Sequence, residues 1–169
     1  MSRITKNGAL TSICSLALLA LTGAMPAHSG PPWVSIEYPV NPYDATHRGA
    51  FLLVREYHHA QQMPGVVTGS AEGLAGGQRR SITLRFDTTS NQSVMALRKQ
   101  WPDAGTWTLL IHVGQGHEGD GVTAIVDIGS AGEVARVRVP TVKQKGWDIP
   151  RVISAGEIDS SLTARAAHR

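Results

Sequence analysis

Apolar and polar residues alternate in short stretches along most of the chain, and the densest of these stretches spans residues 93–116. A strand pattern there leads into Trp101, a short turn follows, and a second strand begins at Trp107. The positions of this second strand that we expect to face a core are Trp107, Leu109, Ile111 and Val113. Successive side chains of a strand point to opposite faces, so His112 falls on the outer face. Two tryptophans beside one turn can fill much of a small core, and this stretch therefore organises the predicted fold.

The same alternation predicts strands in most of the remaining chain, separated by glycine, proline, serine and asparagine, which favour turns. The expected strands are 33–38, 50–58, 66–72, 80–87, 94–100, 122–128 and 133–139, and residues 61–65 are expected to form a loop. In the last strand we expect Val137 to face inward and Arg138 outward. Short strands at regular spacing, without helices between them, are typical of an antiparallel β-sandwich. The fold class is therefore all-β, an immunoglobulin-like sandwich of about seven to eight strands.

One helix is expected, near the C-terminus. Ser154 and Glu157 have the spacing of a capping box, and Ile158 and Leu162 lie four residues apart on one helix face. Gly156 weakens the helix, because glycine lowers helix propensity. We therefore assign residues 30–150 to the sandwich domain and residues 151–169 to a tail that is partly helical or disordered, with a short C-terminal helix.

The first 29 residues have the pattern of a secretory signal peptide. Arg3 and Lys6 precede an apolar run at 9–21, and small residues follow it. The run is shorter than the roughly 20 residues that cross a membrane, although an uncleaved anchor is the alternative. Cleavage after Ser29 fits the small-residue rule best, and cleavage after Ala27 is the alternative. We expect a periplasmic or secreted protein with no membrane span after cleavage.

Charge and cysteine content narrow the function classes. The formal net charge is +3, of which Arg3 and Lys6 supply two units, so the exported part carries about +1. That near-balance argues against a nucleic-acid partner, which favours a concentrated basic face. The only cysteine, Cys14, lies in the expected leader, so thiol catalysis and cysteine-bound zinc are excluded for the exported part. G-x-S-x-G, P-loop and H-E-x-x-H motifs are absent from the sequence, and we expect no enzyme.

Histidine and methionine supply the one candidate for metal chemistry. The candidate ligands are His58, His59, Met63, His112 and His117. Imidazole and thioether groups together suit copper. His58 and His59 lie where a strand meets a loop, with Met63 close behind, while His117 follows the strand that carries His112. Neighbouring residues of a strand point to opposite faces, so a straight strand offers only one of His58 and His59.

Residues 70–113 resemble the YtkA/FixH-like and transthyretin-like periplasmic sandwich domains. Those families often carry an aromatic residue followed by a glycine, a tryptophan and alternating apolar positions near the end of the domain. The matching positions here are Gly105, Trp107, Leu109, Ile111 and Val113, with Met95 near the usual aromatic residue. The resemblance implies an immunoglobulin-like fold and a non-enzymatic accessory role, and it transfers no catalytic residue.

Together these observations predict a non-catalytic accessory or protein-interaction domain of the cell envelope, without a cofactor. Its partner would be another envelope protein, contacted through loops or an edge strand. The alternative is a periplasmic copper-type metal-binding protein that uses the histidines and the methionine named above.

Overall fold

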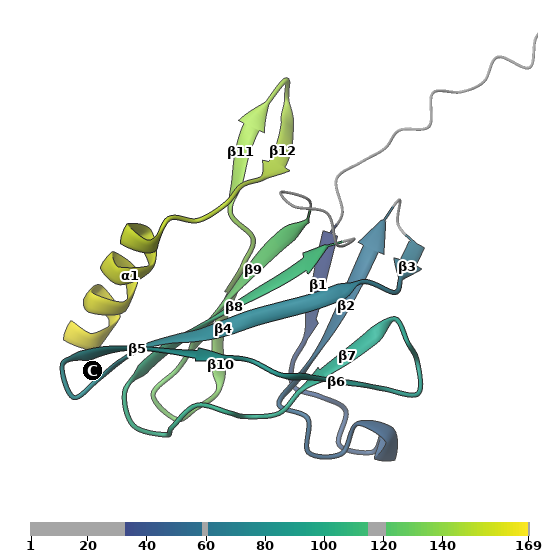
Figure 1. The fold of residues 1–169 in the computed structure, drawn as a ribbon, viewed down its shortest axis with the longest axis horizontal. Helices are drawn as coiled ribbons and strands as arrows, with labels where there is room; N and C mark the ends of the chain where they lie inside the picture. Colours follow the sequence, from purple (N-terminus) through teal and green to yellow (C-terminus); the bar gives the residue numbers. More distant parts are fainter. Residues whose placement is uncertain (1–32, 59–60, 115–120, 169) are drawn as a thin grey trace, which may run out of the picture.

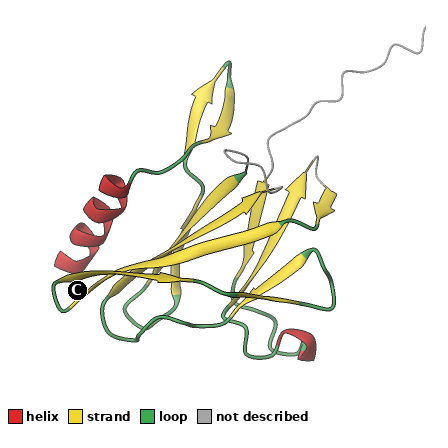
Figure 2. Ribbon diagram, viewed as in Figure 1, coloured by secondary structure: helices red, strands yellow, loops and turns green. Residues whose placement is uncertain are grey.

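The computed structural model describes residues 33–58, 61–114 and 121–168, and strands account for most of them (Figures 1 and 2). Two five-stranded antiparallel sheets, a separate two-stranded hairpin and a C-terminal helix make up this part of the chain. The expected all-β class, with a helix near the C-terminus, is confirmed. The predicted signal peptide, residues 1–29, lies outside the described residues.

The first sheet has the strand order β1-β2-β7-β6, and β3 pairs with the end of β2. Its strands are β1 (Trp33–Glu37), β2 (Leu52–His58), β3 (Gln61–Met63), β6 (Phe86–Thr88) and β7 (Val94–Leu97). A 3-10 turn, η1 (Ala45–His47), lies between β1 and β2. The loop expected at 61–65 is thus in part a strand, because backbone pairing with β2 imposes an extended conformation on Gln61–Met63.

The second sheet has the order β10-β9-β8-β4-β5. Its strands are β4 (Val66–Ala75), β5 (Gln78–Thr83), β8 (Thr106–Gly114), β9 (Val122–Ile128) and β10 (Val134–Arg138). The single strand expected at 80–87 is divided, since β5 belongs to this sheet and β6 to the first. The chain passes between the sheets at Leu84, which is buried and donates its backbone N–H to the carbonyl of Gly69.

Both sheets contribute to one hydrophobic core. Trp107, Leu109, Ile111 and Val113 of β8 are all buried, which confirms the predicted inner face of this strand. The buried partners from the first sheet are Val34, Leu52, Val54 and Leu97. Trp101 is also buried, and its ring meets Phe51 edge to face at a centroid distance of 5.0 Å. The two tryptophans of the stretch 93–116 therefore lie in the core, as the sequence indicates.

At the edge strand β10 the expected inward position is only partly realised. Val137 pairs with the buried Val126 but is itself 44% exposed, because β10 is an edge strand of the second sheet in the described part of the chain. A register shift between Val134 and Arg136 also interrupts the alternation. Arg138 lies on the outer face of the sheet, opposite Ile125, as expected.

The C-terminal part consists of the hairpin β11 (Thr141–Gln144) and β12 (Trp147–Pro150), followed by α1 (Ala155–Ala167). The hairpin projects from the body of the molecule, and α1 lies against the outer face of the second sheet (Figure 1). Ile158 and Leu162 are the buried residues of the helix, and the predicted capping box of Ser154 and Glu157 is present. Among the described residues, no helix is long and apolar enough to cross a membrane.

Candidate functional site

The outer face of the second sheet is polar, yet part of it is buried. Thr106 and Thr108 of β8 are 2% and 1% exposed, and Asp127 of β9 is 4% exposed. Alternation alone assigns these positions to solvent. They are buried because α1 packs across β4 and β8. A buried carboxylate requires compensating charge and hydrogen bonds.

Arg165 of α1 provides much of that compensation. Its Nη1 donates to the carbonyl of Trp107 at 3.1 Å, to Oγ1 of Thr108 at 2.6 Å and to Oδ1 of Asp127 at 3.1 Å. Its Nη2 donates to the carbonyl of Ile128 at 2.5 Å. One guanidinium thus joins the helix to β8 and β9 through both backbone and side-chain acceptors.

Asp127 has a second cationic partner. Nη1 of Arg138 lies 2.5 Å from its Oδ2, and the side chains of Arg138 and Arg165 are 27% and 25% exposed. Thr108 donates its hydroxyl to the same carboxylate at 2.9 Å. A single carboxylate therefore faces two half-buried guanidiniums, one from β10 and one from α1.

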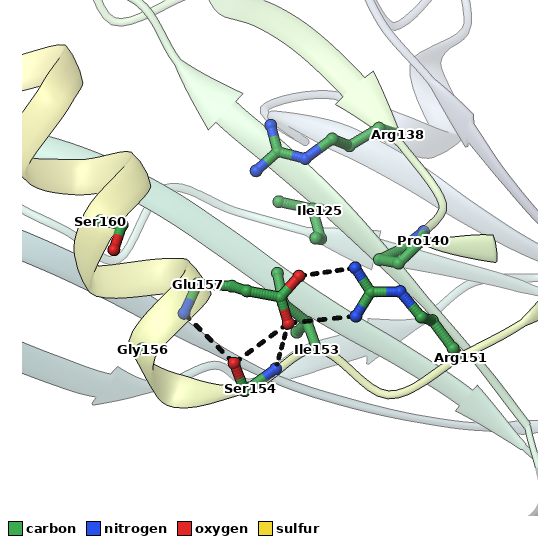
Figure 3. A pocket seen from close by; sticks show the side chains of 9 residues that line it. All are labelled: Ile125, Arg138, Pro140, Arg151, Ile153, Ser154, Gly156, Glu157 and Ser160. Atoms are coloured by element: carbon green, nitrogen blue, oxygen red, sulfur yellow. Dashed lines mark hydrogen bonds and ion pairs between the residues drawn. The ribbon is translucent and has the colours of Figure 1, made fainter. Parts of the chain in front are cut away.

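The segment that leads from the hairpin into α1 carries a second ion pair (Figure 3). Arg151 donates to Glu157 through both terminal guanidinium nitrogens, from Nη2 to Oε1 at 2.5 Å and from Nη1 to Oε2 at 3.1 Å. The backbone N–H and hydroxyl of Ser154 also donate to Glu157, each at 3.0 Å. These hydrogen bonds, of which that from Arg151 has the largest effect, lower the pKa of Glu157 from 4.5 to about 2. The hydrogen bond to Glu157 in turn raises the pKa of Arg151.

Between these two ion pairs lies a cleft of about 690 Å³, which we call the Arg138 cleft. Its lining residues are Ile125, Arg138, Pro140, Arg151, Ile153, Ser154, Gly156, Glu157 and Ser160. Figure 3 shows Arg138 on one rim and the Arg151–Glu157 pair on the other, with Ile125 between them. The cleft thus combines apolar walls with charged rims, as small-molecule sites do.

A smaller cleft of about 430 Å³ lies on the other side of Ile153, which lines both. Its lining residues are Thr68, Gly69, Ser70, Leu110, His112, Thr123, Val152 and Ile153. Nδ1 of His112 lies 3.1 Å from Oγ1 of Thr123 on the neighbouring strand. His112 therefore faces away from the core, as predicted from the alternation of β8.

The predicted metal ligands fall on both sheets. His58 ends β2 and Met63 ends the paired strand β3, so these two lie on neighbouring strands of the first sheet. His112 belongs to the second sheet. His59 and His117 lie outside the described residues. The part of the chain that the structure describes contains no group of three His, Cys, Asp or Glu side chains that could hold a metal.

The copper-type hypothesis therefore stays a prediction. Titration of the purified chain with Cu(II) and Cu(I), followed by calorimetry, tests it directly. Saturable binding that is lost on substitution of His58 or His112 would support the hypothesis, and the absence of saturable binding would contradict it.

The hairpin β11–β12 is a feature that the sequence reading missed. Its two-residue turn, Lys145–Gly146, has φ angles of 51° and 86°. Positive φ at both central residues is favoured in the two-residue turns that connect the strands of a β-hairpin. Val142 pairs with Ile149 and Gln144 with Trp147, so these four side chains share one face. On that face Val142 is 50% exposed and Trp147 is 69% exposed. The Lys-Gly pair between two alternating segments is the signal that could have revealed it.

Comparison with known proteins adds no relative to this description: no family model, curated protein or solved structure matches the chain. The resemblance to the periplasmic sandwich families stays a prediction. The structure itself defines an all-β protein of two antiparallel sheets around one core. Its distinguishing features are a sheet face covered by α1, two clefts beside Ile153 and a projecting hairpin.

Proposed function

We propose that the chain is an exported, non-catalytic accessory or interaction domain of the immunoglobulin-like sandwich type, located in the periplasm or secreted, which contacts another envelope protein through the hairpin β11–β12. The observation that carries this proposal is the apolar face of that hairpin, on which Val142 and Trp147 are exposed and Ile149 is partly exposed.

The hairpin separates apolar from polar side chains. Thr141, Lys143, Asp148 and Pro150 occupy the opposite face, where Lys143 and Asp148 form an ion pair at 2.9 Å. An isolated two-stranded hairpin is marginally stable in water, so an exposed apolar face on such a ribbon favours contact with a further surface. Tryptophan is enriched among the residues that contribute most to protein–protein binding.

The gain from covering Trp147 follows from its exposure. A tryptophan side chain presents up to about 250 Å². Exposure of 69% leaves roughly 170 Å² to be buried. At about 25 cal/mol per Å² this corresponds to ~4 kcal/mol before the costs of association, which is the scale of a binding hot spot.

Site-specific photo-crosslinking in cells that export the chain tests the proposal. A photoreactive residue at Gln144 lies on the apolar face beside Trp147, and one at Arg80 of β5 serves as the control on the body of the molecule. We expect a discrete adduct with one envelope protein from position 144 and none from position 80. The adduct should disappear when Trp147→Ser is added.

Two results would contradict the proposal. Adducts that form equally from both positions would indicate random encounter. An adduct from position 144 that survives Trp147→Ser would show that the apolar face of the hairpin does not make the contact.

A further inference from the structure

The hairpin β11–β12 has two open edges. Its strands form a sheet of their own, so within the described residues neither strand has a second neighbour. An open edge presents backbone N–H and C=O groups to which a further strand can bond. The two edges of this hairpin differ in the donors that they offer.

The hydrogen-bond ladder shows which backbone groups point outward. Opposite residues of an antiparallel pair alternate between pairs that exchange backbone hydrogen bonds and pairs that do not. At the base of the hairpin the N–H of Arg151 donates to the carbonyl of Pro140 at 2.9 Å, so this pair is bonded. Continuing along the register, the pairs bonded inside the hairpin are Val142 with Ile149 and Gln144 with Trp147. The pairs that turn their backbone groups outward are Thr141 with Pro150 and Lys143 with Asp148.

The edge of β11 is complete, whereas that of β12 is not. Thr141 and Lys143 both carry an outward N–H, and in the part of the chain that the structure describes no hydrogen bond reaches their backbone. On β12 only Asp148 has an outward N–H, because the nitrogen of Pro150 carries no hydrogen. Proline is one of the features by which proteins protect an edge against a further strand. The ion pair of Lys143 with Asp148 draws the lysine side chain toward β12 and away from the open edge of β11.

We propose that the partner of the hairpin adds an extended strand to the edge of β11, where its main chain bonds Thr141 and Lys143. This inference rests on the partner contact proposed above and names the manner of that contact. The added segment would alternate apolar and polar residues, with an apolar side chain opposite Val142, because cross-strand neighbours on one face pack together. The apolar face of the hairpin would then continue onto the partner.

A second copy of the chain fits this edge less well. Two β11 strands paired about a two-fold axis would place the apolar faces of both hairpins on the same side of the joint sheet. Trp147, which is 69% exposed, would stay uncovered. A stable interface takes about 20–30 residues from each side, and β11 has four. A different protein can add a strand to β11 and cover Trp147 with the rest of its surface.

Two proline variants compare the edges in the photo-crosslinking assay from position 144. Lys143→Pro removes an outward N–H from β11, and Asp148→Pro removes one from β12. Both variants break the same ion pair, and both keep the bonds inside the hairpin, since edge strands tolerate proline at outward positions. We expect Lys143→Pro to lower the adduct yield at least about tenfold, because it removes a donor and places a ring on the edge. Asp148→Pro should change the yield by less than about twofold, and so should Lys143→Gln, which removes the charge but keeps the N–H.

These outcomes separate the two proposals. Absence of an adduct from position 144 in the parent chain would contradict the partner contact itself. An adduct that forms in the parent chain and persists in Lys143→Pro would leave the partner contact standing and overturn strand addition. Equal losses in the two proline variants would also overturn it.

Hydrogen exchange on the parent chain provides a measurement that needs no variant. The probe is the envelope protein recovered in the adduct from position 144, purified and mixed with the chain. The outward amides of Thr141 and Lys143 should exchange at least about tenfold more slowly in the complex, and that of Asp148 less than about twofold more slowly. Equal slowing at Lys143 and Asp148 would overturn the proposal. A chain that sediments as a dimer, and as a monomer in Lys143→Pro, would assign the edge to a second copy and would likewise overturn it.

Discussion

Replacement of Arg165 by glutamine tests how α1 is held on the second sheet. The helix buries only two side chains, Ile158 and Leu162, and its remaining attachment is polar. Arg165 alone bonds two backbone carbonyls, the hydroxyl of Thr108 and the carboxylate of Asp127. We therefore expect Arg165→Gln to release the helix selectively and to leave the core intact.

The magnitude follows from these contacts. A hydrogen bond that involves a charged group contributes about 1.5–3 kcal/mol, and the four bonds share one side chain, so their contributions do not add. Ordering of the arginine side chain costs up to ~2 kcal/mol, and its 25% exposure screens part of the attraction to Asp127. In the Arg165→Gln variant, Asp127 keeps its ion pair with Arg138. The expected loss is ~3 kcal/mol in the free energy of helix docking.

Native-state hydrogen exchange measures this loss residue by residue. A change of ~3 kcal/mol lowers the protection of the α1 amides about a hundredfold, whereas the amides of β8 and β9 should keep their protection. Arg79→Gln is the matched control. Arg79 also reaches the helix, through Asp159 at 2.6 Å, but its side chain is 37% exposed. Arg79→Gln should lower the free energy of helix docking by no more than about 1 kcal/mol. Equal losses for the two variants, or unchanged α1 protection in Arg165→Gln, would refute the reasoning.

Two further predictions concern glycine positions and acid. A Cβ at Gly73 would lie 2.4 Å from the indole ring of Trp107, so Gly73→Ala should lower the free energy of unfolding by ~1–3 kcal/mol in urea titrations. A Cβ at Gly156, in α1, would have no atom within 4 Å, so Gly156→Ala should raise the free energy of unfolding by about 0.4–1 kcal/mol. Equal shifts in the two variants would contradict this steric argument. Because the pKa of Glu157 is lowered from 4.5 to about 2, its stabilisation of α1 is complete above pH 4.5 and is lost as the pH falls toward 2. Hydrogen exchange at pH 5 and pH 2.5 should therefore show a larger acid loss of α1 protection in the parent chain than in Glu157→Gln, and equal losses would exclude this ion pair as the cause.

The sequence predicts those elements whose signals are local. The bounds of β9 agree with the expected strand 122–128, and the inner face of β8 is the expected one. The capping box of α1 is likewise read from four consecutive residues, Ser154 to Glu157. In each case the pattern that determines the conformation lies within the element itself.

Elements that depend on distant pairing were not predictable in the same way. The alternation of Ile82, Leu84 and Phe86 continues without a break while the chain passes from one sheet to the other. Gln61–Met63 has no alternation of its own and is extended because it pairs with β2. Hydrophobic periodicity gives the face of a strand, but it does not give the sheet to which the strand belongs.

The polar outer face of the second sheet shows the same limit at the level of the site. Alternation assigns Thr108, Asp127 and Arg138 to solvent, and the sequence does not show that Arg165, about 40 residues after Asp127, returns to bind it. The candidate ligands named from composition, His58, Met63 and His112, fall instead on two sheets. The arginine-rimmed cleft arises from helix docking, which is a tertiary event.

Segment 151–154 makes the hairpin and the helix depend on one another. The backbone N–H of Arg151 donates to the carbonyl of Pro140 at the base of the hairpin, while its side chain binds Glu157 in the first turn of α1. The same short segment supplies Ile153 to both clefts. The hairpin forms a sheet of its own, so Arg151 and α1 help to fix the position of Trp147, together with the short link from β10, whose Val139 packs against the core. It follows that release of the helix in Arg165→Gln should also loosen the hairpin and open the Arg138 cleft, although neither contacts Arg165 directly.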